Sequence, residues 1–171
     1  DPSQLHDPLL LKGMAEAVAR LRDAINRKQR VLIIGDYDAD GICATAILYK
    51  YLLTQRVRTS YFLPERDADG YGLNIDLIGR LHEKFQPNLL ITVDCGISNI
   101  EEIHHANDLG VEVIVTDHHN PRELLPEAII ILDPKLPDSG YPFCDISGAA
   151  IAYKISKALR FSQTPLYNAE I

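Results

Sequence analysis

Apolar runs and amphipathic stretches alternate along this chain, which predicts strands and helices in turn. Several short runs are continuously apolar or β-branched, as is typical of strands that are buried on both faces. We therefore expect strands at residues 31–35, 56–64, 88–93, 111–116 and 127–134. Apolar residues at helical spacing, such as Met14, Val18 and Leu21, predict helices between the strands. These helices are expected at 14–28, 41–54, 74–85 and 99–109.

This alternation predicts an α/β fold: a doubly wound, mainly parallel five-stranded sheet with helices on both faces, of Rossmann-like type. The chain has 171 residues, of which 46% are hydrophobic, and this suits one compact domain. We expect residues 1–171 to form that single domain, with residues 1–13 as a short lead-in.

Three carboxylates follow the first strand directly, in the stretch VLIIGDYDADGICATA at 31–46. Asp36, Asp38 and Asp40 alternate, so an extended backbone would place them on one side. Crowded carboxylates repel one another unless a cation neutralises them, and oxygen ligands suit Mg²⁺ or Mn²⁺. The sequence therefore predicts a metal site here.

Two later strands also end in polar clusters, at Asp94 and at Asp117, His118 and His119. The carboxyl ends of parallel strands meet at one edge of the sheet, where open α/β sheets place their sites. A two-metal constellation is therefore expected from the side chains of Asp38, Asp40, Asp94, His118 and His119. Adjacent residues diverge on extended backbone, so only one of the two histidines is expected to be a direct ligand.

Asp36 and Asp117 each have two interpretations. Asp36 is either a ligand or a residue that caps the following turn, since short Asp side chains readily bond nearby amides. Asp117 either touches metal or orients a histidine, as carboxylates behind metal ligands commonly do. We favour the supporting role for both.

Several ordered motifs resemble those of the DHH phosphoesterase superfamily. They are GDYDADG at 35–41, VDCGIS at 93–98 and TDHH at 116–119. Within the superfamily the likeness is greatest to the RecJ family of exonucleases specific for single-stranded DNA. ERDADGYGLN at 65–74 resembles a Gly-Tyr-Gly loop of that family, and ISGAAIAYKISKALR at 146–160 resembles its small-residue helix.

The resemblance implies a metal-dependent exonuclease that degrades single-stranded DNA 5′ to 3′ in repair and recombination. It implies two ions, Mn²⁺ or Mg²⁺, and a water activated by metal. The implied metal ligands are Asp38, Asp40, Asp94 and His118, with Asp94 bridging both ions. The implied catalytic residues are Asp94, His118 and His119, and the expected contacts to substrate phosphate are His119, Arg66, Ser147 and Gly148.

The chain also departs from the superfamily's pattern. Ile34 stands where pyrophosphatase-like members carry a histidine ligand, which weakens a pyrophosphatase assignment. A further aspartate, supplied by a fourth motif in the superfamily, has no counterpart up to Ile171, so we expect a fragment of a longer chain. Two alternatives remain open: a phosphodiesterase acting on oligonucleotides or cyclic dinucleotides, and a non-catalytic module that binds a replication or repair partner.

Composition narrows the picture further. The net charge of −7, without a basic stripe, is unlike that of a free-standing nucleic-acid binder, so grip on a DNA backbone must come largely from elsewhere. A single-strand-binding protein or a repair protein as partner fits the resemblance, but no residue identifies one. No apolar run of membrane-spanning length and no signal peptide is found, so we expect a cytoplasmic protein. Cys43, Cys95 and Cys144 form no CxxC pair, and we expect reduced, mostly buried thiols.

Overall fold

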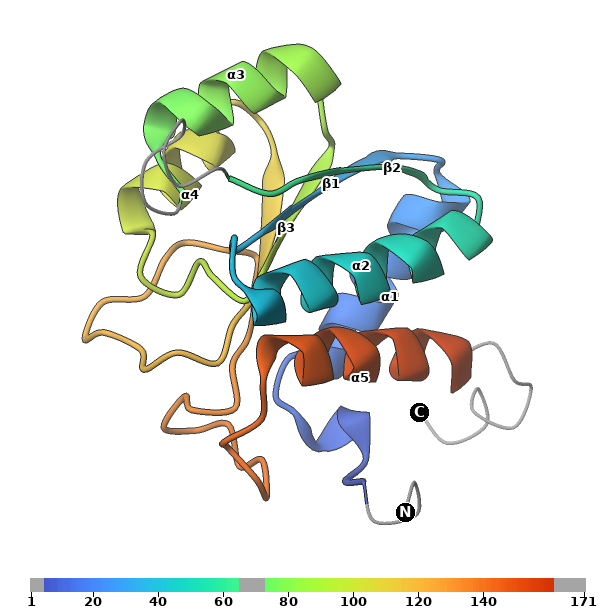
Figure 1. Cartoon of the computed structure of the whole chain (residues 1–171), viewed down its shortest axis with the longest axis vertical. Helices are drawn as coiled ribbons and strands as arrows, with labels where there is room; N and C mark the ends of the chain where they lie inside the picture. Colours follow the sequence, from blue (N-terminus) through green and yellow to red (C-terminus); the bar gives the residue numbers. More distant parts are fainter. Residues whose placement is uncertain (1–4, 65–72, 162–171) are drawn as a thin grey trace.

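The computed structural model describes residues 5–64 and 73–161, which form one five-stranded sheet between two layers of helices (Figure 1). The strand order is β2-β1-β3-β4-β5, and every neighbouring pair is parallel. The strands are β1 (Arg30–Gly35), β2 (Arg58–Phe62), β3 (Leu89–Val93), β4 (Glu112–Thr116) and β5 (Ile130–Leu132). The predicted doubly wound α/β fold is confirmed.

Helices cover both faces of the sheet. They are α1 (Met14–Asn26), α2 (Ala39–Thr54), α3 (Ile75–Phe85), α4 (Ile100–Asp108) and α5 (Gly148–Phe161). The lead-in contains a short 3-10 helix, η2 (Pro8–Leu10). In Figure 1, α1, α2 and α5 lie below the sheet, whereas α3 and α4 lie above it. No helix in the described part of the chain has the length and apolar character needed to cross a membrane.

The alternation of side chains along β1 explains the two layers. Val31 and Ile33 enter the core with α1, α2 and α5, while Leu32 and Ile34 enter the core with α3 and α4. All four side chains are at most 2% exposed. Because both faces of the strand are buried, its sequence is continuously apolar rather than alternating.

Three predicted elements were too long, for reasons visible in the backbone. The helix expected to reach residue 28 ends at Asn26, and Lys28 has a left-handed φ of 53°. The strand expected from residue 56 begins at Arg58, because Arg56 has a φ of 58°. The strand expected at 127–134 is only Ile130–Leu132, since this edge strand pairs with β4 alone.

The cysteines are less buried than expected. Cys43 and Cys144 are exposed, and Cys95 is half-buried. Cys43 lies on the solvent side of α2, whose buried positions include Ala44, Leu48 and Leu52. The prediction of mostly buried thiols was wrong, because Cys43 lies on the exposed face of α2 and Cys144 is exposed in the loop between β5 and α5.

The strand order reverses at β1 and β3, which are neighbours in the sheet but not in the sequence. After β1 the chain enters α2 on one face, and after β3 it enters α4 on the other (Figure 1). The two connections therefore part at the carboxyl ends of these strands. Open α/β sheets bind ligands at such a switch point.

Close packing around Gly41 yields a stability prediction. A Cβ on Gly41, in the first turn of α2, would lie 2.4 Å from the carbonyl oxygen of Asp36. Gly41→Ala should therefore lower the free energy of unfolding by about 1–3 kcal/mol, the usual range for overpacking. Gly79→Ala, in α3, is the matched control, because the atom nearest to the added Cβ would be Nε2 of His105 in α4, at 3.9 Å.

The control should raise the free energy of unfolding by roughly 0.5–1 kcal/mol, the helix-propensity difference between Ala and Gly. Urea unfolding followed by circular dichroism measures both values. Equal effects of the two substitutions would contradict this account of the loop after β1.

Candidate metal centre

Asp94 lies at the centre of the candidate site, directly after β3 at the switch point. Its side chain is 1% exposed, and its backbone has a left-handed φ of 61°. A positive φ is uncommon outside glycine and is concentrated at functional sites, although Asp tolerates it better than most residues. Gly148 permits the close approach of α5, since a Cβ there would lie 2.7 Å from Asp94 Oδ1.

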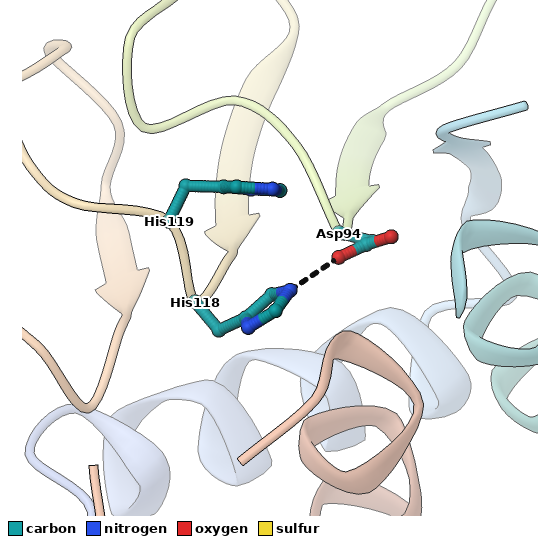
Figure 2. Close-up of side chains that lie close together, drawn as sticks. All are labelled: Asp94, His118 and His119. Carbon is teal, nitrogen blue, oxygen red and sulfur yellow. Dashed lines mark ion pairs between the residues drawn. The ribbon is translucent and has the colours of Figure 1, made fainter. Parts of the chain in front are cut away.

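His118 faces Asp94 from the loop after β4, and Figure 2 shows this pair with His119 beside it. His118 Nε2 lies 2.9 Å from Asp94 Oδ1, yet this buried oxygen accepts no hydrogen bond from any described residue. A buried carboxylate oxygen without a hydrogen-bond donor is costly unless something else satisfies it. A divalent cation held by both side chains fits this arrangement.

Two groups of possible ligands share Asp94. One consists of Asp94, His118 and His119, and the other of Asp36, Asp38 and Asp94; within each group the ligand atoms lie within 4.8 Å of one another. A carboxylate common to two such groups has the place of a bridging ligand. The group with two imidazoles and a carboxylate suits Mn²⁺. The group made of carboxylates alone suits either Mg²⁺ or Mn²⁺.

Asp38 and Asp40 are held by the ends of two helices. Asp38 is the N-cap of α2, where its Oδ1 accepts a hydrogen bond from the Gly41 amide at 2.9 Å. Asp40 accepts hydrogen bonds from the amides of Gly148 and Ala149 at 2.7 and 2.8 Å. Its Oδ2 also lies 3.5 Å from His118 Nε2. Carboxylate oxygens retain further lone pairs, so both residues can still bind a cation.

The amides of α5 are therefore already occupied. Gly148, a predicted contact for substrate phosphate, donates its amide to Asp40 instead. Ser147 accepts a hydrogen bond from the Ala150 amide through its hydroxyl at 3.2 Å. The Gly148 amide, at the positive end of this helix, thus binds a carboxylate of the protein itself, whereas the phosphate contact expected of Ser147 stays a prediction.

Asp117 joins the loops after β3 and β4. Its Oδ1 lies 2.7 Å from His119 Nδ1 and accepts the amides of His118 and His119. Its Oδ2 accepts the Ile97 amide at 2.9 Å. Asp117 is 1% exposed and fixes the ring of His119, which leaves His119 Nε2 for other partners. Asp36 accepts a hydrogen bond from the Tyr37 amide at 2.7 Å and also lies within the second ligand group, so both interpretations of Asp36 stay open; the N-cap of α2 is Asp38.

The buried charges shift the pKa values of the cluster. Burial, followed by the nearby Asp40 and Asp38 carboxylates, raises the pKa of Asp94 to about 8. Burial and the neighbouring His119 lower the pKa of His118, so its imidazole is neutral and able to bind metal at neutral pH. Burial is the largest single effect on His119 and lowers its pKa, but the hydrogen bond to Asp117 and the negative charges of Asp117, Asp94 and Asp36 together outweigh it, so the net shift is upward.

Some functional candidates were missed or fall outside the structure. Arg66, a predicted phosphate contact, lies outside the described residues. The positive charge of Lys135, on the loop after β5, acts on His118 and contributes to its lowered pKa. Arg122 lines a cavity beside His119 and Asp94. Neither basic residue belongs to a recognisable motif. The one signal in the sequence that could have identified them is their position in the loops that follow β4 and β5.

The motif order and the Asp94 centre agree with the comparisons with known proteins. The model of the DHH family, N-terminal domain, matches residues 30–170. The chain belongs to the DHH family. The RecJ single-stranded-DNA-specific exonuclease of Bacillus subtilis (strain 168) is 38% identical over 92% of this chain and 20% of its own length. RecJ of Escherichia coli (strain K12) is 38% identical over 88% of this chain and 26% of its own length.

A crystal structure of exonuclease RecJ bound to manganese superposes with a TM-score of 0.78 at 37% identity. The superposition covers 91% of this chain and 40% of the chain in that crystal. The predicted resemblance to DHH proteins, and to RecJ among them, is confirmed. This chain spans only about a fifth to a quarter of the curated relatives that it matches here.

The raised pKa of Asp94 predicts how stability depends on pH when divalent metal is removed by a chelator. Because the folded-state pKa lies near 8, the folded protein binds this proton more tightly than the unfolded chain does. The free energy of unfolding should therefore fall as pH rises toward 8. Thermal melts with EDTA should show this decline. It should be smaller in Asp94→Asn, and an unchanged pH dependence would show that Asp94 is not desolvated.

Metal binding tests the cluster directly. Asp94→Asn should weaken Mn²⁺ binding by at least about 10-fold, since even residues behind metal ligands commonly contribute 10- to 100-fold. Glu83→Gln is the matched control, because Glu83 is exposed on α3, outside both ligand groups. Isothermal titration calorimetry compares the three proteins. Equal affinities would place the cation elsewhere.

Proposed function

We propose that this chain is the metal-dependent nuclease core of a RecJ-like exonuclease that hydrolyses single-stranded DNA, 5′ to 3′, in repair and recombination. The observation that carries the proposal is the buried Asp94 oxygen, which has His118 at 2.9 Å and no hydrogen-bond donor among the described residues. Two RecJ relatives at 38% identity, from Bacillus subtilis and Escherichia coli, are both named as specific for single-stranded DNA and support the choice of substrate.

The protein side chains divide the work at the crevice. Asp38, Asp40, Asp94 and His118 would hold two divalent cations, Mn²⁺ or Mg²⁺, with Asp94 common to both. When bound, such cations lower the pKa of an attacking water and neutralise charge on the phosphate. The α5 amides fix Asp40, and the α2 amide fixes Asp38, so the ligand positions are set before substrate arrives.

His119 is suited to contact the scissile phosphate. Asp117 holds its Nδ1 and raises its pKa, which favours the imidazolium form, in which Nε2 can donate to a phosphate oxygen. His119 is the more exposed histidine, with 57% of its side chain accessible against 24% for His118. His118, the less exposed histidine, is thereby suited to bind metal, and His119, the more exposed one, is suited to bind substrate.

Digestion by the full-length protein tests this proposal. With Mn²⁺, 5′-phosphorylated single-stranded DNA should be degraded and duplex DNA spared, and a label at the 5′ end should be released first. Asp94→Asn should lower kcat at least about 100-fold, because it removes a ligand rather than a residue behind one. Glu83→Gln should leave the rate unchanged, since Glu83 is remote from the cluster.

Two other outcomes would contradict the proposal. Cleavage of dinucleotides or cyclic dinucleotides without digestion of long strands would favour a small-molecule phosphodiesterase. Normal Mn²⁺ binding without hydrolysis of any of these substrates would favour a non-catalytic module.

A further inference from the structure

A cavity of about 470 Å³ opens beside the metal cluster. Asp94 and His119 lie on its cluster side, while Leu73, Ile97 and Asn99 line the part that extends toward α4. Its volume falls within the usual range for ligand pockets. A group that projects from the cluster would therefore enter a preformed space, part apolar and part polar.

The charge of this cavity is unbalanced. Four carboxylate residues line it: Asp36, Asp94, Asp117 and Glu102. Among the described lining residues, the only Lys or Arg is Arg122. Two cations in the cluster would engage Asp94. Asp36 already accepts a hydrogen bond from the Tyr37 amide, and Asp117 already accepts hydrogen bonds from His119 and Ile97. Arg122 is the positive group that remains for an incoming anion.

The surroundings of Arg122 favour such a role. Its side chain is exposed and forms no ion pair or hydrogen bond with any other described residue. It follows His119 by three residues, on a loop whose base Asp117 fixes through the His118 and His119 amides. A guanidinium group matches two phosphate oxygens at once, which makes arginine well suited to phosphate recognition.

We propose that Arg122 binds a phosphate of the DNA strand adjacent to the scissile phosphate, within this cavity. The inference rests on the proposed function, because it takes the scissile phosphate to lie at the metal cluster. It adds a substrate-binding residue from the loop after β4, where the chain as a whole carries a net charge of −7. Arg122 thereby adds positive charge to the cavity beside that of His119.

The test pairs the loss of the side chain with the loss of the phosphate charge. In the full-length protein, Arg122→Ala should lower kcat/KM on 5′-phosphorylated single-stranded DNA about 10-fold, mainly through KM, as expected for a hydrogen bond between charged groups. Arg122→Lys should recover part of that loss. Arg58→Ala is the control for charge, because Arg58 is exposed at the opposite end of the sheet.

A set of strands then carries one neutral methylphosphonate at each linkage near the scissile one. If Arg122 contacts one phosphate, a methylphosphonate at that linkage should lower kcat/KM of the wild type about as much as Arg122→Ala lowers it on natural DNA. The same methylphosphonate should not lower kcat/KM of Arg122→Ala any further. Additive losses at every linkage, or a normal kcat/KM in Arg122→Ala, would overturn the proposal. Unchanged Mn²⁺ affinity in Arg122→Ala shows that the metal cluster is intact.

Binding separates this inference from the proposed function. Fluorescence anisotropy with a labelled single strand should show weaker binding to Arg122→Ala than to the wild type. The slope of log affinity against log salt concentration should also be smaller for the variant, by the amount that corresponds to about one phosphate contact. If the wild type hydrolyses DNA but both proteins bind alike, only the role of Arg122 fails. If the wild type hydrolyses nothing, the proposed function fails, and the difference in binding still decides whether Arg122 contacts phosphate.

Discussion

The parallel register of β1, β3 and β4 is the constraint on which the rest of the site depends. Gly35 pairs with Val93, and Val93 with Thr116, so three strands end at the same level. The residues that follow them are the acidic loop, Asp94 and the Asp117 to His119 cluster. Both faces of these strands pack against helices, and a shift by one residue would exchange the side chains of the two cores, which are packed for particular neighbours.

The site also depends on a long-range contact between the first turns of α2 and α5. Asp40, in the first turn of α2, accepts the first amides of α5, which is more than a hundred residues away along the chain. The absence of a side chain at Gly148 lets α5 approach Asp94 closely. The positive end of α5 thus offsets part of the repulsion among the carboxylates, while divalent cations would offset the remainder.

Electrostatics at the crevice combine buried negative charge with exposed positive charge. The carboxylates of Asp94 and Asp117 are 1% exposed, whereas Arg122 is exposed at the rim of the cavity. Lys135 adds a second positive charge near His118. Such an arrangement would favour cations inside the cavity and an anionic group at its rim, although the net charge of the chain is −7.

Much of this molecule was predictable from its sequence, because the relevant signals are local. Continuous apolar runs predicted the buried strands β1, β3 and β4, and the ligand motifs follow these three strands directly. The ends of the elements were less predictable. Lys28 and Arg56 adopt a left-handed backbone conformation near two of these ends, and no local sequence pattern indicates it. Burial of Cys43 was predicted wrongly, since exposure depends on which helix face meets a neighbour.

The sequence by itself determined the order of strands and helices, the fold class and the positions of Asp94, His118 and His119 at strand ends. Only the tertiary structure decided that the α5 amides bind Asp40 rather than a phosphate, that Asp117 orients His119, and that Arg122 reaches the cavity. The reason is physical. Periodicity and motifs record local backbone preferences, whereas these contacts join residues from separate elements and arise only when the helix layers pack on the sheet.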